Sequence, residues 1–227
     1  MPDSSHIDLE IRPGLRLSSG LALFVESLRA LIVADVHWGY AVSQRRAGRL
    51  LPQWGDEAIQ ERLDALVRHY RPALLVVAGD VVHAPAGAGA ARTGLASLPD
   101  GLEIVCVGGN HDRKSPVPCA PSFQAGGLFI HHGDRDVAVP PGALEIVGHF
   151  HPAATWSDGT GTALKLPALV DGPRRLILPA FSPWAAGVPW NRRLGSDERL
   201  WFIAPRRIFP WRPSRREPTP QPPRRTD

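Results

Sequence analysis

The sequence has few cysteines and no long apolar run. Only two of its 227 residues are cysteines, too few for the disulfide framework that holds small secreted domains together. No stretch reaches the roughly 18 consecutive apolar residues of a membrane-spanning helix, and the start, MPDSSHIDLE, does not resemble a secretory signal. These absences argue against a secreted or membrane protein, and we expect a globular cytoplasmic protein with no membrane partner.

Positive charge is also scarce outside the last part of the chain. The formal net charge is +4, but residues 205–227 hold seven arginines and two acidic residues, a net of +5, which leaves −1 on the other 204 residues. The same 23 residues contain seven prolines and hardly any apolar residue after Trp211. We therefore expect a domain over residues 1–204 and a disordered tail over residues 205–227, which is either a solvated segment or a nucleic-acid contact.

Apolar runs separated by turns predict a chain made mostly of strands. One helix is predicted over residues 56–70, where Asp56 can cap it and apolar residues recur at three- and four-residue spacing. The apolar run that follows is typical of a strand buried on both faces and completes a β-α-β unit. The segment from His83 to Gly94 is rich in small residues and is expected to be a mobile loop. The predicted strands are residues 21–25, 28–34, 73–78, 102–107, 127–130, 144–147, 163–169, 174–178 and 199–203.

Five of these strands are followed by residues of the types that bind metals. Because the carboxyl ends of parallel strands form the ligand crevice of an open sheet, these residues can converge although they span more than a hundred positions. One motif, Asp-x-His, would arise in about half of all shuffled chains, whereas GNHD would arise in roughly one in two thousand. Imidazole, carboxylate and amide ligands without thiolate suit Mn, Fe or Zn. The motifs are DVH (35–37), GD (79–80), GNHD (109–112), HHGD (131–134) and GHFH (148–151).

The five motifs, in this order and each after an apolar strand, resemble the calcineurin-like metallophosphoesterases over roughly residues 28–180. Longer strings resemble, more narrowly, the bacterial ligase-associated DNA damage response endonucleases, the PdeM family: ADVHWG, QRRAG, GDVVH, GHFHP and LPAF. The resemblance implies an α/β fold, an α/β/β/α sandwich of mixed β-sheets in a single domain. It also implies a role in DNA repair, with DNA ligase or helicase as partners.

Two divalent metal ions are implied by the same resemblance, with Mn²⁺ preferred and Fe or Zn as alternatives. Transferred position by position, Asp80 would bridge both ions. The first ion would take Asp35, His37 and His151, and the second Asn110, His132 and His149.

A water molecule and several further side chains would take part in the reaction. Between the two ions a water would become the hydroxide that attacks phosphorus. His111 would protonate the departing oxygen, and Asp112 would orient the imidazole of His111. Three arginines could bind substrate phosphates bidentately, namely Arg45, Arg46 and Arg113.

Several positions keep two interpretations. His132, which is followed by glycine, fits the family's pattern better than His131, which could instead satisfy the strand end. His83 lies either near the ligands or on the ordinary surface. The aromatic residues of the last third, Phe181 and Trp184 among them, are explained by core packing more readily than by base stacking.

The residues therefore predict a metal-dependent phosphodiesterase, and the resemblance indicates single-stranded or damaged DNA as the substrate. A domain of nearly neutral charge suits a long polyanion poorly, so a small phosphoester (a nucleotide, a pyrophosphate or a phosphomonoester) is the second hypothesis. The third is a nucleic-acid-binding protein that keeps a metal site only for its shape.

Overall fold

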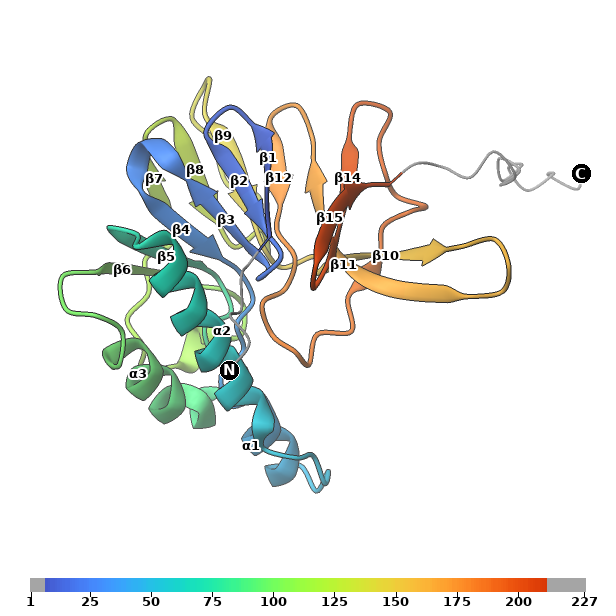
Figure 1. The fold of residues 1–227 in the computed structure, drawn as a ribbon. Helices are drawn as coiled ribbons and strands as arrows, with labels where there is room; N and C mark the ends of the chain where they lie inside the picture. Colours follow the sequence, from blue (N-terminus) through green and yellow to red (C-terminus); the bar gives the residue numbers. More distant parts are fainter. Residues whose placement is uncertain (1–6, 212–227) are drawn as a thin grey trace, which may run out of the picture.

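The computed structural model describes residues 7–211, in which two β-sheets lie face to face and the helices lie beside the first sheet (Figure 1). The strands of the first sheet are β1 (Asp8–Arg12), β2 (Leu15–Ser18), β3 (Ala22–Val25), β4 (Ala30–Val33), β5 (Leu74–Ala78) and β6 (Glu103–Val107). They lie in chain order. Strands β1 to β4 pair antiparallel, whereas β4, β5 and β6 pair parallel, so the carboxyl ends of these last three strands meet at one edge.

The second sheet is formed by the later part of the described chain. Its strands are β7 (Phe123–Ala125), β8 (Leu128–His131), β9 (Leu144–Val147), β10 (Pro152–Ser157), β11 (Ala163–Asp171), β12 (Arg175–Ile177), β13 (Val188–Pro189), β14 (Arg199–Ala204) and β15 (Arg207–Pro210). The order is β13-β10-β11-β12-β9-β8-β7, and β14 pairs with β11 and β15. Strands β8, β9 and β12 run parallel.

The helices cover the outer face of the first sheet. They are α1 (Tyr40–Arg46), α2 (Trp54–Tyr70) and α3 (Ala88–Ala96), with 3-10 turns η1 (Glu26–Leu28), η2 (Pro85–Gly87) and η3 (Asp112–Lys114). Helix α2 buries Ile59, Leu63 and Leu66 against this sheet, as their spacing predicts. Asp56 does not cap α2, because its Oδ1 accepts the backbone N–H of Gly39 at 2.9 Å. None of the helices within residues 7–211 combines the length and apolar character needed to cross a membrane.

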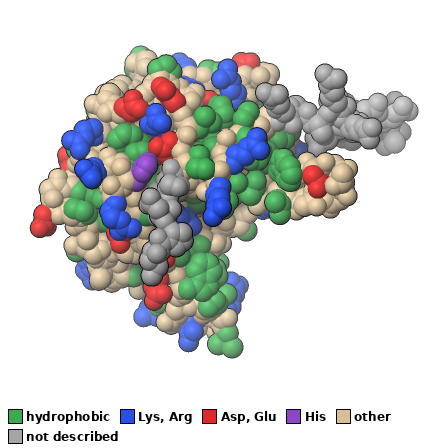
Figure 2. All heavy atoms as spheres, viewed as in Figure 1, with side chains coloured by type: hydrophobic (Ala, Val, Ile, Leu, Met, Phe, Trp, Pro, Cys, Tyr) green, Lys and Arg blue, Asp and Glu red, His purple; other side chains and the backbone are tan. Residues whose placement is uncertain are grey.

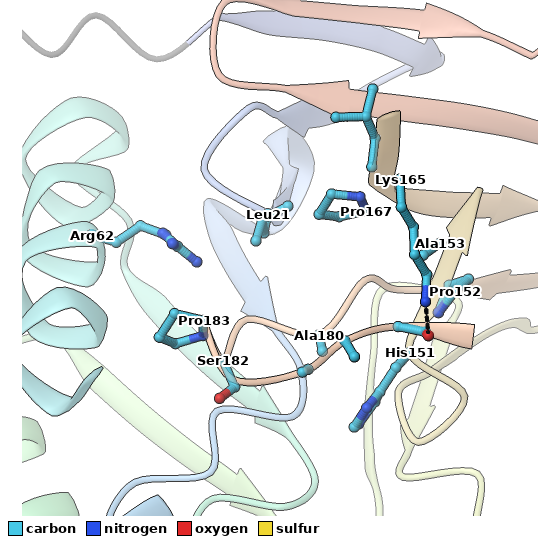
Figure 3. Close-up of a pocket in the computed structure, with 14 residues that line it drawn as sticks. Leu21, Arg62, His151, Pro152, Ala153, Lys165, Pro167, Ala180, Ser182 and Pro183 are labelled. Carbon is cyan, nitrogen blue, oxygen red and sulfur yellow. Dashed lines mark hydrogen bonds between the residues drawn. The ribbon is translucent and has the colours of Figure 1, made fainter. Parts of the chain in front are cut away.

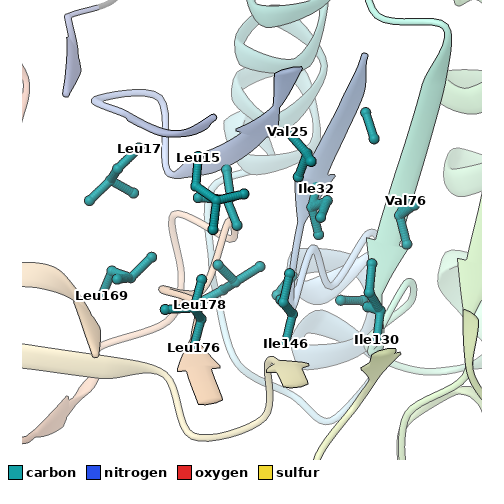
Figure 4. Packing of buried hydrophobic residues seen from close by; sticks show 14 of the residues in the cluster. Leu15, Leu17, Val25, Ile32, Val76, Ile130, Ile146, Leu169, Leu176 and Leu178 are labelled. Carbon is teal, nitrogen blue, oxygen red and sulfur yellow. The ribbon is translucent and has the colours of Figure 1, made fainter. Parts of the chain in front are cut away.

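The main core lies between the two sheets (Figure 4). Leu17 and Ile32 of the first sheet and Ile130, Ile146 and Leu176 of the second are almost completely removed from solvent. Burying a side chain of this size contributes about 1.5–3 kcal/mol. This packing fixes the two sheets relative to each other and therefore fixes the edge where their strands end.

The predicted α/β fold with mixed sheets is confirmed, and so is the β-α-β unit, because β4 and β5 pair parallel on either side of α1 and α2. The predicted loop from His83 to Gly94 is wrong, since most of it forms η2 and α3, and Ala88 and Ala91 are buried. The second helical layer of the expected sandwich is absent from residues 7–211. In its place, Trp190 from the irregular segment after β13 packs in an apolar cluster with residues of β9, β10, β11, β12 and β14.

The end of the domain also differs from the prediction. Strand β15 lies beyond residue 204, pairs antiparallel with β14 and buries Ile208. The ordered sheet therefore continues into the segment predicted as a tail from residue 205. Residues 212–227 lie outside the described residues, so the disorder of that part stays a prediction.

A cross-strand ion pair on the second sheet makes stability depend on pH. Glu145 on β9 accepts hydrogen bonds from Arg175 on β12, at 2.5 and 2.7 Å, and contacts His131 on β8 at 2.7 Å. Burial alone would raise the pKa of Glu145, but the hydrogen bonds from Arg175 and His131 outweigh it and lower that pKa. Because the folded-state pKa is lowered, the pair stabilises the fold above the unfolded-state pKa, and this contribution is lost as the pH falls.

We expect Glu145→Gln to remove part of this acid dependence. Thermal unfolding measured between about pH 6 and pH 3 should show the melting temperature falling more steeply in the wild type than in the variant. Glu61→Gln, at an exposed position on α2, is the matched control and should follow the wild type. Parallel melting-temperature curves for the wild type and Glu145→Gln would show that Glu145 is not the source of the acid dependence.

Candidate metal centre

The carboxyl ends of five parallel strands bring the predicted ligand residues to one edge of the two sheets. Three of these strands, β4, β5 and β6, belong to the first sheet, and two, β8 and β9, to the second. In chain order, the residues that follow them are Asp35, His37, Asp80, Asn110, His132, His149 and His151. The structure therefore brings together all seven predicted ligands.

Asp35, His37 and His151 form the first of two groups. One ligand atom from each lies within 4.8 Å of the others, and Asp35 Oδ1 is 3.3 Å from His151 Nε2. Asp35 is fully buried, and its two oxygens accept the backbone N–H of His149 at 3.0 and 2.9 Å. The carboxylate is thereby held facing the two imidazoles, and the three side chains could hold a cation.

Asn110, His132 and His149 form the second group. His132 Nε2 lies 3.1 Å from Asn110 Oδ1 and 3.1 Å from His149 Nδ1. The Asn110 oxygen can only accept a hydrogen bond, and at most one hydrogen can lie between the two imidazole nitrogens. Several acceptor atoms therefore lie close together, which is the arrangement expected of the ligands of a cation.

Asp80 lies between the two groups. Its Oδ2 is 3.4 Å from His132 Nε2 and 3.7 Å from His37 Nε2, while Oδ1 accepts the backbone N–H of His111 at 3.0 Å. Burial would raise the pKa of Asp80, but the hydrogen bond and charge of His132, with the N–H of His111, lower it to about 2. The ionised carboxylate faces both groups, which is the position of a ligand shared by two cations.

The backbone is strained at the same residues. Of the eight non-glycine residues between 7 and 211 with positive φ, five belong to the predicted ligand set: Asp35, His37, Asp80, His149 and His151. Such a conformation costs on the order of 1–3 kcal/mol per residue. Strain concentrated in this way indicates that the positions of these side chains matter more than the local stability of the chain.

Two glycines explain why the ligands can approach one another. A Cβ on Gly79, whose φ is +85°, would lie 1.9 Å from His132 Nδ1, and one on Gly109 would lie 2.2 Å from Asp80 Oδ1. Neither position can hold a side chain without displacing a ligand. The glycines of the GD and GNHD motifs are therefore required by the packing of the site.

The donor set fits divalent cations. Burial lowers the pKa of His37 to about 3 and also lowers that of His149, which favours the neutral form of both rings and so keeps a lone pair on each. His37 Nδ1 and His132 Nδ1 are buried without a hydrogen-bond partner among the described residues, and His151 Nε2 faces the Asp35 carboxylate at 3.3 Å. Imidazole, carboxylate and amide oxygen together suit Mn, Fe or Zn and do not select one of them.

The two adjacent histidines point in different directions. His131 ends β8 and contacts Glu145, whereas His132 lies at the ligand edge, 1% exposed, beside Asp35 and Asp80. The period of two along a strand sends neighbouring side chains to opposite faces. The alternative left open by the sequence is thus resolved geometrically in favour of His132 as the group that lies in the cluster.

His111 lies in the site, but Asp112 does not contact its imidazole. The Asp112 carboxylate accepts the backbone N–H groups of Val81, Val82 and Gly109 at 3.1, 3.0 and 2.9 Å. His111 Nδ1 instead lies 2.7 Å from the carbonyl oxygen of His83. The predicted orienting role of Asp112 is corrected accordingly: η3 turns this carboxylate inward, where it joins the ends of β5 and β6.

The three arginines predicted to bind substrate lie away from the ligands. Arg113 pairs with Asp134 at 3.2 Å and is 64% exposed. Arg45 donates to the carbonyl of Leu51 at 3.3 Å, and Arg46 is exposed. None of the three lines the cavity in front of the ligands, and their contact with phosphate stays a prediction.

The cavity in front of the ligands has a volume of about 380 Å³, and its wall includes residues that no motif indicated. Tyr40 comes from the first turn of α1, and Ser182 and Trp184 from the segment after β12. The backbone N–H of Ser182 donates to the carbonyl of Asp35 at 3.1 Å, which ties this segment to the site. His83 lines the cavity as well, so of its two interpretations the one near the ligands is correct.

A second cavity, of about 320 Å³, adjoins the first and shares His151 and Ser182 with it (Figure 3). Lys165 lies on one side, and its ammonium donates to the carbonyl of Gly187 at 2.7 Å. Arg62 lies on the other side, over the ring of Phe181. Within residues 7–211 both cations donate to backbone carbonyls, Arg62 to that of Phe181 at 2.7 Å, so this cavity brings two positive charges beside the ligands.

Comparison with known proteins identifies a family and solved structures of similar fold. The family described as calcineurin-like phosphoesterase matches residues 28–200, and a search of curated proteins finds no match. A solved structure, the nuclease MPE of Pseudomonas putida, is 27% identical with a TM-score of 0.68, covering 91% of this chain and 100% of that chain. Yfce, a phosphoesterase from E. coli, is 17% identical over 77% of this chain and 87% of that chain, and its TM-score of 0.41 is too low to support an argument.

The contacts of Asp112 predict a structural effect on substitution. Asp112→Ala would leave three buried backbone N–H groups without an acceptor, so we expect the free energy of unfolding to fall by about 3 kcal/mol or more. Urea unfolding followed by circular dichroism measures this, with Asp100→Ala at an exposed turn position as control. Unchanged stability together with a loss of turnover would instead favour the role in orienting His111.

Proposed function

The chain belongs to the calcineurin-like phosphoesterase family, which makes it a metal-dependent phosphoesterase, and we propose that it hydrolyses phosphodiester bonds of nucleic acid, above all DNA. The observation that carries the proposal is the position of Asp80. One carboxylate oxygen faces His37 in the first ligand group and His132 in the second. This arrangement supports a dinuclear site rather than two separate ones.

In the proposed site, Asp80 belongs to both ions. One ion would be held by Asp35, His37 and His151, and the other by Asn110, His132 and His149. Two divalent ions, when bound, would lower the pKa of a water molecule and neutralise charge on phosphoryl oxygens. The strained backbone at five of the seven residues holds these side chains in place before substrate arrives, which reduces the reorganisation needed during the reaction.

His111 is the residue that we assign to the departing oxygen. A carbonyl can only accept, so the contact with the His83 carbonyl requires His111 Nδ1 to carry a hydrogen. Nε2 is then the nitrogen that gains and loses a proton. The ring lines the cavity in front of the ligands, where Nε2 can protonate the leaving group.

The choice of nucleic acid rests on the similarity to the Pseudomonas putida nuclease, which extends over nearly the whole of both chains. By the resemblance of its motifs, we also infer a role in DNA repair in the cytoplasm, manganese as the metal, and DNA ligase or helicase as partners. Arg45, Arg46 and Arg113 remain candidates for contacts with more distant phosphates.

A small phosphoester is the second candidate, and one observation favours it. Residues 1–204 carry a net charge of −1, whereas proteins that bind long polyanions usually present a basic face. A small substrate would need no such face. Substrates of different length therefore distinguish the two candidates.

Metal loading and a substrate panel test the proposal. With Mn²⁺ at fixed concentration, the wild type should cut single-stranded DNA, and a chelator should abolish the activity. Asp80→Ala should lose both bound metal and turnover. His111→Ala should keep the metal, measured by elemental analysis, and lose about a hundredfold or more in turnover. Hydrolysis of small diesters without cleavage of DNA would favour the second candidate. Unchanged activity in both Asp80→Ala and His111→Ala would contradict the roles assigned to these two residues.

The cation beside His151 predicts an effect on substrate binding. Lys165→Met should raise the KM for an oligonucleotide several-fold with little change in kcat, because the ammonium would contact a phosphate that does not react. The chain has one other lysine, Lys114, which is exposed and lines neither cavity. Lys114→Met is thus the matched control, and equal changes in the two variants would exclude a specific role for Lys165.

A further inference from the structure

A continuous row of five aromatic rings runs from the candidate metal centre to the surface. His111 stacks on His83 with ring centroids 4.8 Å apart, and His83 lies 4.5 Å from Tyr40. Tyr40 stacks on Trp184 at 5.7 Å with 16° between the planes, and Trp184 lies 4.8 Å from Trp54. We call these five rings the ring row.

The ring row is fixed by the fold. Tyr40 and Trp54 begin α1 and α2, and Trp184 comes from the segment tied to Asp35. A Cβ on Gly55 would lie 2.0 Å from Trp184 Nε1, so only glycine at this position lets the indole lie against α2. Three separate parts of the chain thus converge to build the outer three rings, and His83 and His111 follow β5 and β6.

Core packing does not account for the outer rings. Trp38 and Trp190 are 1% and 8% exposed, as expected for core tryptophans, whereas Trp54 is 48% exposed. Tyr40 and Trp184 line the cavity in front of the ligands. The row therefore offers aromatic surface to a molecule that occupies the site and extends outwards from it.

Positive charge lies beside the outer end of the row. Arg45, Arg46 and Arg49 lie on α1 or just after it and are exposed. None of them pairs with a carboxylate in the described part of the chain, since the recorded partners are the carbonyl of Leu51 and the side chain of Gln44. Figure 1 shows α1 in the part of the molecule that extends downwards, and Figure 2, in the same view, shows basic and apolar side chains together on that part.

We propose that the ring row is a stacking surface for unpaired bases next to the scissile phosphate, with Trp54 as its outermost platform. The inference rests on the proposed function, because the reacting phosphate must lie at the ligands. Planar rings alone would suit any flat ligand, but rings flanked by cations match a strand that alternates bases and phosphates. Bases within a duplex are already stacked on one another, so the surface selects unpaired nucleotides.

Binding without turnover tests the stacking directly. Metal-free protein in chelator is titrated with two fluorescent oligonucleotides of equal length, one of deoxyadenylates and one with the same phosphates but abasic sugars. The wild type should bind the base-bearing strand about tenfold more tightly than the abasic strand. Trp54→Ala should remove most of this difference by weakening only the base-bearing complex, and Trp54→Phe should restore part of it.

A matched control separates stacking from general effects. Trp156, on β10, is 37% exposed and lines neither of the two cavities beside the ligands, so Trp156→Ala should bind both strands as the wild type does. Equal wild-type affinity for the two strands, or no binding of either, would overturn the proposal. It would also fail if Trp54→Ala weakened both complexes equally.

Failure of this inference can be told apart from failure of the proposed function. Hydrolysis of both oligonucleotides by metal-loaded wild type is measured separately. If both strands are cut and the base makes no difference to binding or KM, the site acts on nucleic acid and the ring row has another role. If neither strand is cut but base-dependent binding persists, the stacking surface stands and the assignment of the reaction falls.

Discussion

The buried carboxylate of Asp80 is the group on which the rest of the site depends. An anion removed from water needs compensation, and Asp80 receives it from the imidazole of His132 and from the N–H of His111. His132 follows β8 of the second sheet and His111 follows β6 of the first, so the compensation requires the two sheets to be packed together. The apolar core between the sheets is therefore a condition for the site, and the strained ligand residues depend on the stability that it supplies.

Much of the fold can be predicted because buried strands of the parallel type are apolar along their whole length. Strand β5 is the clearest example, since all five of its residues are buried. Strand β1, DLEIR, buries only Ile11 and has no comparable run. Helix α3 is also hidden in the sequence, because alanine and glycine show no clear apolar face. It forms where small residues pack tightly, with Trp38 lying 3.3 Å from where a Cβ of Gly94 would be.

The convergence of the candidate ligand residues was predictable for a related reason, since each follows an apolar strand and strand ends converge at a sheet edge. What could not be predicted is the surroundings of each ligand. Asp112 follows His111 directly in the chain, yet η3 directs the two side chains to different partners. No motif contains Tyr40, Trp184 or Lys165. They reach the site only because of how their segments pack: α1 carries Tyr40, the segment after β12 carries Trp184, and β11 carries Lys165.

This division between strand ends and surrounding segments bears on specificity. Five of the seven candidate ligands sit on strained backbone, and Gly79 and Gly109 leave room for His132 and Asp80, so the chemistry there can change little without loss of the site. The surroundings are different, because the three outer rings (Tyr40, Trp184 and Trp54) and the Arg62–Lys165 cavity lie on α1, α2, β11 and the segment after β12. Side chains there can change without moving the ligands. Bases stacked on the outer rings of the ring row, together with a phosphate held in the Arg62–Lys165 cavity, would orient a nucleic-acid strand across Asp80. The reaction is thus set by the sheet edge, and the choice of substrate by the segments around it.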